Sequence, residues 1–246
     1  MDQERLYQLS AAVDGPRRDY SSALITRDRF VIDDLVHMAM NRSLEVAELS
    51  VGDGRMTLAM LASLPDVRLT CAEISELRIE QLRKDIAAGS SVGCTPEFVI
   101  CNFDTDFGHF ASDTYDAVIA LDIMEHVLDV FGFVNNCRRI LRRGGRLYLR
   151  VPNIAYLKHR LNLLRGCLPV TASWFGPHGD LAAWRDKHGW DGGHLHLFTV
   201  PMLLRLIREG GLEVVSCDDP GAKLAGWRKV WPNLLFANPL IIAGKN

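Results

Sequence analysis

The sequence has no long hydrophobic run, no excess of charge of one sign and no close pair of cysteines. No apolar stretch approaches the roughly 20 residues that cross a bilayer, and the first residues lack the basic and apolar regions of a signal peptide. With 28 basic and 30 acidic residues, the formal net charge is −2, which offers little attraction to a nucleic acid. We therefore expect a cytoplasmic protein that binds neither a membrane nor a nucleic acid.

The cysteines and histidines form no pattern typical of a metal site. The six cysteines are scattered without a C-x-x-C pair, so we expect them to be free thiols. The eight histidines include one close pair, His194 and His196, and no H-E-x-x-H spacing is present. The sequence alone therefore predicts no metal ligands.

Short apolar runs rich in Val, Ile and Leu alternate with longer amphipathic stretches along most of the chain. This alternation is typical of βαβ units, in which a parallel sheet is covered on both faces. We predict an α/β, Rossmann-like fold with a mostly parallel seven-stranded sheet and helices on both faces. The predicted strands are 44–49, 67–73, 97–102, 115–122, 146–151, 212–217 and 240–244, and the predicted helices include 55–64, 75–88, 131–143 and 199–209.

A glycine loop connects the first predicted strand to the helix that follows it. Gly52 and Gly54 lack a Cβ, so the backbone can turn sharply there and approach a ligand closely. Glu73 ends the second predicted strand, 19 residues after Gly54, where a carboxylate can accept both hydroxyl hydrogens of a ribose. Loop and carboxylate together indicate a cofactor that contains a nucleoside.

Two cofactor classes would suit this arrangement. A dinucleotide loop has a third glycine and places a pyrophosphate at the helix N-terminus, but Met56 and Thr57 stand there instead. Carboxylates at Glu48 and Asp53 would repel a pyrophosphate and attract an ammonium and a sulfonium group, which favours S-adenosyl-L-methionine. An NAD-dependent or nucleotide-sugar oxidoreductase is the alternative, although the sequence has no Tyr-x-x-x-Lys pair.

Five segments between residues 44 and 153 resemble, in the correct order, the motifs of class I S-adenosylmethionine-dependent methyltransferases. The resemblance is to the group that includes MetW-like and ubiquinone-biosynthesis-like enzymes. The segments are 48–54, 71–75, 98–104, 115–126, and 141–145 with 151–153. Ser50 replaces the first glycine of the loop motif, and Asn102 stands where an aspartate is usual.

The resemblance implies S-adenosyl-L-methionine as the cofactor and S-adenosyl-L-homocysteine as the product. It also implies a cofactor site built from the ends of the first four strands. The implied cofactor contacts are Glu48, Ser50, Gly52, Gly54, Glu73, Ile74, Asn102, Phe103, Leu121 and Asp122.

Methyl transfer from a sulfonium is an in-line displacement, so positioning of the reactants supplies much of the catalysis. A base is needed when the acceptor is a hydroxyl or a protonated amine, and histidine is the usual choice. His194 and His196, just before the helix that starts at Thr199, are the candidate catalytic residues. The alternative is that their side chains orient the loop or cap the helix, while His126 suits a structural turn or a substrate contact.

We predict one methyltransferase domain over residues 1–246 that acts on an oxygen or nitrogen atom of a small molecule. Within it we expect a helical lid in 1–40, the cofactor-binding core in 41–153, an insertion on the acceptor side in 154–198, and the last helix with two strands in 199–246. Loops beyond the carboxyl ends of the strands border the ligand site in such sheets. The alternative within this resemblance is a MetW-like regulatory or partner subunit that binds the cofactor without turnover.

Overall fold

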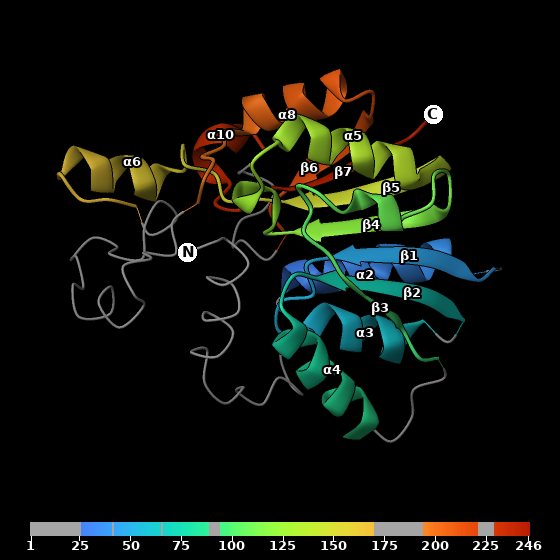
Figure 1. Ribbon diagram of the computed structural model, residues 1–246. Helices are drawn as coiled ribbons and strands as arrows, with labels where there is room; N and C mark the ends of the chain where they lie inside the picture. The colour runs from blue at the N-terminus through green and yellow to red at the C-terminus, as the bar shows by residue number, and fades with distance from the viewer. Residues whose placement is uncertain (1–25, 41, 65, 89–93, 170–193, 221–228) are drawn as a thin grey trace.

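The computed structural model describes residues 26–40, 42–64, 66–88, 94–169, 194–220 and 229–246 (Figure 1). Part of the predicted lid, residues 1–25, lies outside the described residues, as does most of the predicted acceptor-side insertion, residues 170–193. Among the described helices, none combines the length and the apolar character needed to cross a membrane.

A seven-stranded sheet forms the centre of the molecule and confirms the predicted α/β fold. The strand order is β3-β2-β1-β4-β5-β7-β6, and every neighbouring pair is parallel except the two pairs that β7 makes with β5 and β6. The strands are β1 (Leu44–Leu49), β2 (Val67–Glu73), β3 (Glu97–Ile100), β4 (Tyr115–Leu121), β5 (Leu141–Arg150), β6 (Glu213–Asp218) and β7 (Leu240–Gly244).

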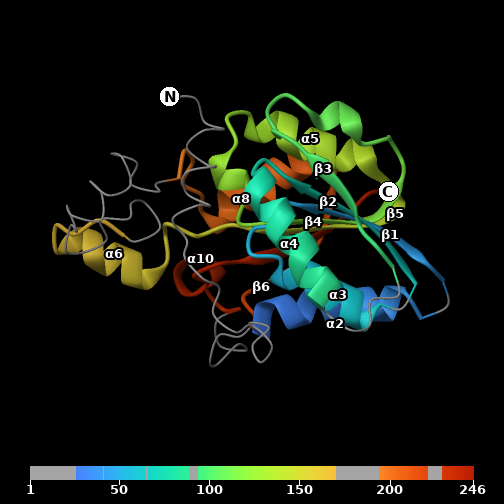
Figure 2. The same ribbon diagram turned by 60° about the horizontal axis from the view of Figure 1, so that its bottom comes forward.

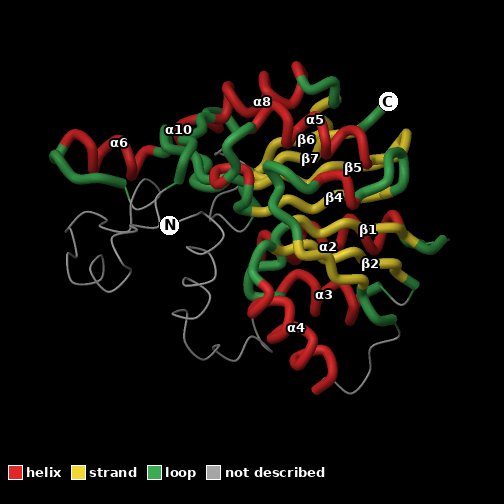
Figure 3. Tube along the Cα trace, viewed as in Figure 1, coloured by secondary structure: helices red, strands yellow, loops and turns green. Residues whose placement is uncertain are grey.

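Helices cover both faces of this sheet, as Figures 1 and 2 show. In Figure 3 the helices α5 and α8 lie on one side of the strands, and α3 and α4 lie on the other. The helices are α2 (Thr26–Met38), α3 (Arg55–Ser63), α4 (Glu76–Ala88), α5 (Val130–Ile140), α6 (Leu157–Leu164), α8 (Val200–Glu209) and α10 (Pro232–Leu235), with the short 3₁₀ turns η1 (Phe107–His109) and η2 (Met124–His126).

The two faces of the sheet carry two separate hydrophobic clusters. Successive side chains of a strand point to opposite faces, so β4 sends Val118 into the cluster beneath α5 and α8, and Ile119 into the cluster beneath α2 and α3. Both residues are almost completely buried. Because β4 is apolar on both sides, it can occupy the centre of a sheet that is covered twice.

Helix α2 packs on the sheet, which differs from the lid expected for residues 1–40. Its Val31 and Leu35 are fully buried in the cluster shared with α3. Asp34 accepts hydrogen bonds from Arg146 Nη1 at 2.8 and 2.9 Å and from the Tyr148 hydroxyl at 2.5 Å, both on β5. The described part of the N-terminal segment is therefore a layer of the core.

The predicted helix 131–143 is wrong at its C-terminal end. Asp129 caps α5 by accepting a hydrogen bond from Gly132 N at 2.9 Å, but the helix ends at Ile140. Leu141 is already extended and pairs with Tyr115 of β4, so the chain enters β5 before the two glycines. By contrast, the predicted start of the last long helix at Thr199 is confirmed, since Thr199 Oγ1 caps the helix by accepting a hydrogen bond from Met202 N at 3.4 Å.

Candidate functional site

The carboxyl ends of β1, β2, β3 and β4 lie at one edge of the sheet. The parallel register brings Leu49 next to Ala72 and Ala120, and Glu73 next to Ile100. The chain order reverses between β1 and β4, and ligands of open α/β sheets bind outside the strand ends at such a reversal. Each predicted cofactor residue lies at this edge, at the end of one of these strands or in the loop that follows.

The glycine loop has three residues in the left-handed region of backbone conformation. Ser50, Gly52 and Gly54 have φ angles of 68°, 58° and 79°. A Cβ placed on Gly52 would meet no atom within 4 Å, so the preference for glycine here comes from the backbone conformation alone. Ser50 adopts the glycine-like conformation although it carries a side chain.

Glu73 is buried beside this loop and holds its backbone. Its Oε2 accepts a hydrogen bond from Gly52 N at 3.1 Å, and its Oε1 accepts from Ile74 N at 3.1 Å and from Ser75 N at 3.2 Å. A carboxylate has about four acceptor positions, of which these contacts use three, so Oε2 retains one position for a ribose hydroxyl. The donor set therefore fits a nucleoside, and Glu73 also fixes the shape of the loop that would contact it.

Glu48 is a buried carboxyl group between β1 and α3. Its Oε2 accepts a hydrogen bond from Thr57 Oγ1 at 2.5 Å. Burial, with smaller contributions from the charges of Asp53 and Glu73, raises the pKa of Glu48 to about 8. This burial favours the neutral acid at neutral pH, whereas the sequence argument treated Glu48 as charged; its contact with the cofactor stays a prediction. Asp53, in turn, pairs with Arg55 at 2.8 Å.

The loop after β3 uses its polar groups to fold on itself. Asn102 Oδ1 accepts from Asp104 N, and Asp106 Oδ2 accepts from Asn102 N, both at 3.0 Å. Asp104 Oδ1 accepts from Leu128 N at 2.8 Å, which ties this loop to the one after β4. Phe103 packs against the rings of Phe107 and Phe133, so its ring belongs to the hydrophobic core.

The segment after β4 begins with an ion-paired carboxylate. Leu121 ends the strand and is half buried, and Asp122 follows it with a φ of 56°. Asp122 Oδ2 accepts from Arg150 Nε at 3.0 Å and from Arg150 Nη2 at 2.6 Å, while Arg150 Nη1 reaches Asp28 of α2 at 2.7 Å. Asp122 is thus paired with a cation, and its predicted contact with the cofactor stays a prediction.

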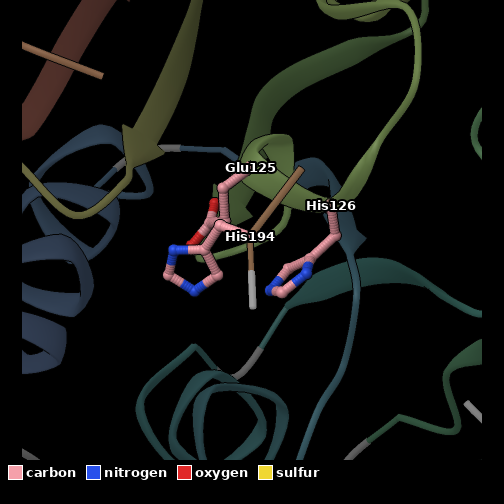
Figure 4. Close-up of side chains that lie close together, drawn as sticks. All are labelled: Glu125, His126 and His194. Carbon is pink, nitrogen blue, oxygen red and sulfur yellow. The ribbon is translucent and has the colours of Figure 1, made fainter. Parts of the chain in front are cut away.

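Three side chains gather in front of the end of β4, as Figure 4 shows. They are Glu125 and His126 of η2 and His194 of a distant segment, and each offers a ligand atom within 4.8 Å of the others. The rings of His126 and His194 are perpendicular, with their centroids 4.8 Å apart. We refer to Glu125, His126 and His194 as the Glu-His-His cluster.

Burial dominates the ionisation of this cluster. Burial lowers the pKa of His126 to about 4, and His194 lowers it further. Burial also lowers the pKa of His194, although the negative charge of Asp122 partly offsets this effect. Burial, reinforced by Asp122, raises the pKa of Glu125 well above its usual value. Both imidazoles are therefore neutral near pH 7, the state in which a histidine can accept a proton or donate a lone pair.

The two predicted catalytic histidines lie in different surroundings. His194 belongs to the cluster, whereas the ring of His196 lies with Nε2 3.3 Å from the carbonyl oxygen of Leu128. Sequence reasoning omitted Glu125 and gave His126 no definite role. Their signal was the Glu-His pair just after an apolar strand, but nothing in the sequence indicated that His194 would meet it.

Comparisons with known proteins agree with this description. Residues 47–147 match the family described as a methyltransferase domain. A ubiquinone biosynthesis O-methyltransferase from Methylocella silvestris is 30% identical over 105 residues, which cover 43% of this chain and 39% of that protein. The human mitochondrial ubiquinone biosynthesis O-methyltransferase is 29% identical over 68 residues, 28% of this chain and 18% of that protein. The chain thus matches well under half the length of these curated relatives.

A solved structure supports the fold over almost the whole chain. The magnesium protoporphyrin IX methyltransferase of Synechocystis PCC 6803, with bound S-adenosylhomocysteine, superposes with a TM-score of 0.61 at 13% identity, covering 98% of this chain and 94% of that one. The matching segment, residues 47–147, is a methyltransferase domain, and its relatives and fold support a class I S-adenosylmethionine-dependent methyltransferase with S-adenosylmethionine as the cofactor. This result confirms the predicted class and leaves the oxidoreductase alternative without support.

Proposed function

We propose that this chain transfers a methyl group from S-adenosylmethionine to an oxygen or nitrogen atom of a small molecule. The observation that carries the proposal is that the glycine loop, Glu73 and the Glu-His-His cluster share one edge of the sheet. The cofactor supplies the methyl group on a sulfonium and leaves as the thioether. The names of the curated relatives, ubiquinone biosynthesis O-methyltransferases, favour an oxygen acceptor.

The residues of this chain divide the work of such a transfer. The loop and Glu73 would hold the nucleoside and so fix the direction of the methyl group. His194, neutral and next to the strand ends, can take the proton that the acceptor loses as its lone pair forms the new bond to carbon. The electron pair of the broken carbon–sulfur bond stays on sulfur, so the positively charged sulfonium becomes a neutral thioether.

The test combines cofactor binding with turnover on the purified full chain. Binding of S-adenosylhomocysteine would be measured by calorimetry, and transfer would be followed with S-adenosylmethionine labelled in the methyl group and a panel of phenols, alcohols and amines. We expect tight binding and a labelled product from at least one oxygen or nitrogen acceptor. Binding without transfer to any acceptor would instead support the regulatory-subunit alternative, and failure to bind would refute the proposal.

A further inference from the structure

We propose that Arg150 is a positioning residue for cofactor binding: it orients Asp122 so that one carboxylate oxygen of Asp122 can bind the ammonium group of S-adenosylmethionine. Arg150 ends β5, and Asp122 follows the end of β4. The inference rests on the predicted contact of Asp122 with the cofactor, and it requires no particular acceptor. No motif in the sequence indicated a role for Arg150.

The pairing between Arg150 and Asp122 uses only one oxygen of the carboxylate. Arg150 Nε and Nη2 both donate to Asp122 Oδ2, at 3.0 and 2.6 Å. Within the described parts of the chain, Asp122 Oδ1 accepts no hydrogen bond. The side chain of Asp122 is 44% exposed, against 11% for Arg150, so a ligand can reach the carboxylate.

A second carboxylate fixes the guanidinium group from α2. Arg150 Nη1 donates to Asp28 Oδ1 at 2.7 Å, and the side chain of Asp28 is 5% exposed. A buried carboxylate needs a partner, and the guanidinium group is a rigid plane with donors in fixed directions. A rotation of this plane away from Asp122 would therefore also disturb the contact with Asp28, so α2 holds Arg150 in one orientation.

The backbone of Asp122 is bound to the same residue. Asp122 N donates to the carbonyl oxygen of Arg150 at 2.9 Å, and the φ of Asp122 is 56°, in the left-handed region. A residue with a Cβ adopts this conformation at a cost, which persists only where the surrounding structure holds it. Main chain and side chain of Asp122 are thus both held by Arg150, as expected where a site needs a side chain in one fixed direction.

Asp122 lies close to both parts of the site. Leu49 of β1 pairs with Ala120 of β4, so the glycine loop and Asp122 leave neighbouring strands at the same edge of the sheet. Burial has the largest effect on the pKa values of the Glu-His-His cluster, and the charge of Asp122 raises the pKa of all three members. Asp122 is therefore near the loop predicted to hold the cofactor and near the proposed acceptor side.

The other carboxyl groups predicted to contact or attract the cofactor suit an ammonium group less well. Burial raises the pKa of Glu48 to about 8, so this group is neutral near pH 7. Both oxygens of Asp53 contact Arg55, and Glu73 accepts three backbone hydrogen bonds. Asp122 keeps a whole oxygen for a cation, because the arginine is bound to the other one.

A similar ion pair, four residues earlier in β5, provides a matched control. Arg146 Nη1 donates to both carboxylate oxygens of Asp34 in α2, at 2.9 and 2.8 Å. Arg146 pairs with Ala117 of β4, before the carboxyl end of that strand. This pair also joins α2 to β5, but it does not contact Asp122. A comparison of the two arginines therefore separates a link between α2 and the sheet from the orientation of Asp122.

The test measures binding of two ligands to the purified full chain. S-Adenosylhomocysteine carries the ammonium group, whereas 5′-methylthioadenosine has the nucleoside and the thioether sulfur without it. Arg150→Lys keeps the positive charge but replaces the planar fork by a rotatable ammonium group. By calorimetry we expect an affinity loss of about 10-fold for S-adenosylhomocysteine, from one misplaced charge-assisted hydrogen bond, and less than about twofold for 5′-methylthioadenosine.

Three further variants complete the experiment. Arg146→Lys should leave both affinities unchanged. Asp122→Asn should weaken S-adenosylhomocysteine at least as much as Arg150→Lys does, and in the Asp122→Asn background Arg150→Lys should have little further effect, because Arg150 acts through Asp122. Asp28→Asn loses the charge that anchors Arg150 and keeps an oxygen, so it should cause a smaller loss for S-adenosylhomocysteine alone. Thermal denaturation checks the folding of each variant.

Equal losses for the two ligands in folded Arg150→Lys would overturn the proposal, since they would show a purely structural role. Unchanged affinity in Arg150→Lys or in Asp122→Asn would overturn it as well, as would losses that simply add in the double variant. No acceptor takes part in these measurements. The expected binding pattern in a protein that methylates no acceptor would therefore leave Arg150 as a positioning residue and count against the proposed function.

Discussion

The proposed cofactor side of the site is made of residues that each follow their own strand, whereas the proposed acceptor side joins side chains 68 positions apart, His126 and His194. On the cofactor side, Glu73 contacts the backbone of the neighbouring loop, and the contacts depend on the register of parallel strands. On the acceptor side, the contacts depend on a segment that returns to η2 from beyond β5. The first arrangement follows from the order of the parallel strands, and the second depends on how one distant segment packs against η2.

The largest effect should come from the acceptor side. His194→Ala removes the imidazole of the cluster, so we expect turnover to fall by about 10²-fold or more while the affinity for S-adenosylhomocysteine stays nearly constant. His196→Ala should cost much less, because His196 lies against the Leu128 carbonyl outside the cluster. Steady-state kinetics and calorimetry on both variants would check this, and equal losses would show that the segment acts only as a unit.

For Glu73, on the cofactor side, we expect a substitution to weaken cofactor binding. Glu73→Ala removes a buried carboxylate that accepts three backbone hydrogen bonds, so binding of S-adenosylhomocysteine should weaken by up to about 3 kcal/mol. Glu73→Gln, which keeps the shape and loses the charge, provides the control. A normal affinity in Glu73→Ala would mean that the nucleoside does not contact this residue.

Glu48 allows a test that depends on pH. Burial raises its pKa in the folded protein to about 8, above the value of an exposed glutamate, so the folded state binds a proton that the unfolded state has released. Its contribution to stability is therefore greatest at low pH and is lost as the pH rises through 8. Relative to Glu48→Gln, the wild type should lose about 2 kcal/mol of unfolding free energy between pH 6 and 8.

Urea denaturation of both proteins at several pH values would measure this difference. Parallel pH profiles for the wild type and Glu48→Gln would mean that the carboxyl group is ionised in the fold. Glu48 would then be a charged carboxylate beside the glycine loop, as the sequence argument assumed.

The smallest effect is expected at Ser50. Its φ of 68° costs a residue with a Cβ about 1 kcal/mol, whereas glycine adopts this angle freely. Ser50→Gly should therefore raise the free energy of unfolding by up to about 1 kcal/mol, reduced by the greater flexibility of glycine in the unfolded chain. Thermal denaturation with and without S-adenosylhomocysteine would show whether the serine serves binding. A lower stability in the variant would indicate that the Ser50 side chain makes a compensating contact.

Several features of the fold could be predicted from local patterns. The bounds of β1, β2 and β7 match the predicted runs, because apolar residues on both faces distinguish a central strand from its surroundings. The end of α5 could not be predicted in this way. Leu141 and the basic residues after it suit either a helix end or a strand, and the pairing of Leu141 with Tyr115 decides between them.

The sequence by itself determined the class of fold and the cofactor, because the glycine loop and the carboxylate of Glu73 follow strands whose order along the chain fixes their place in the sheet. Only the tertiary structure decided the ionisation of Glu48, the pairing of Asp122 with Arg150, and the meeting of His194 with Glu125 and His126. These depend on burial and on contacts between distant segments, and neither is encoded in the spacing of neighbouring residues.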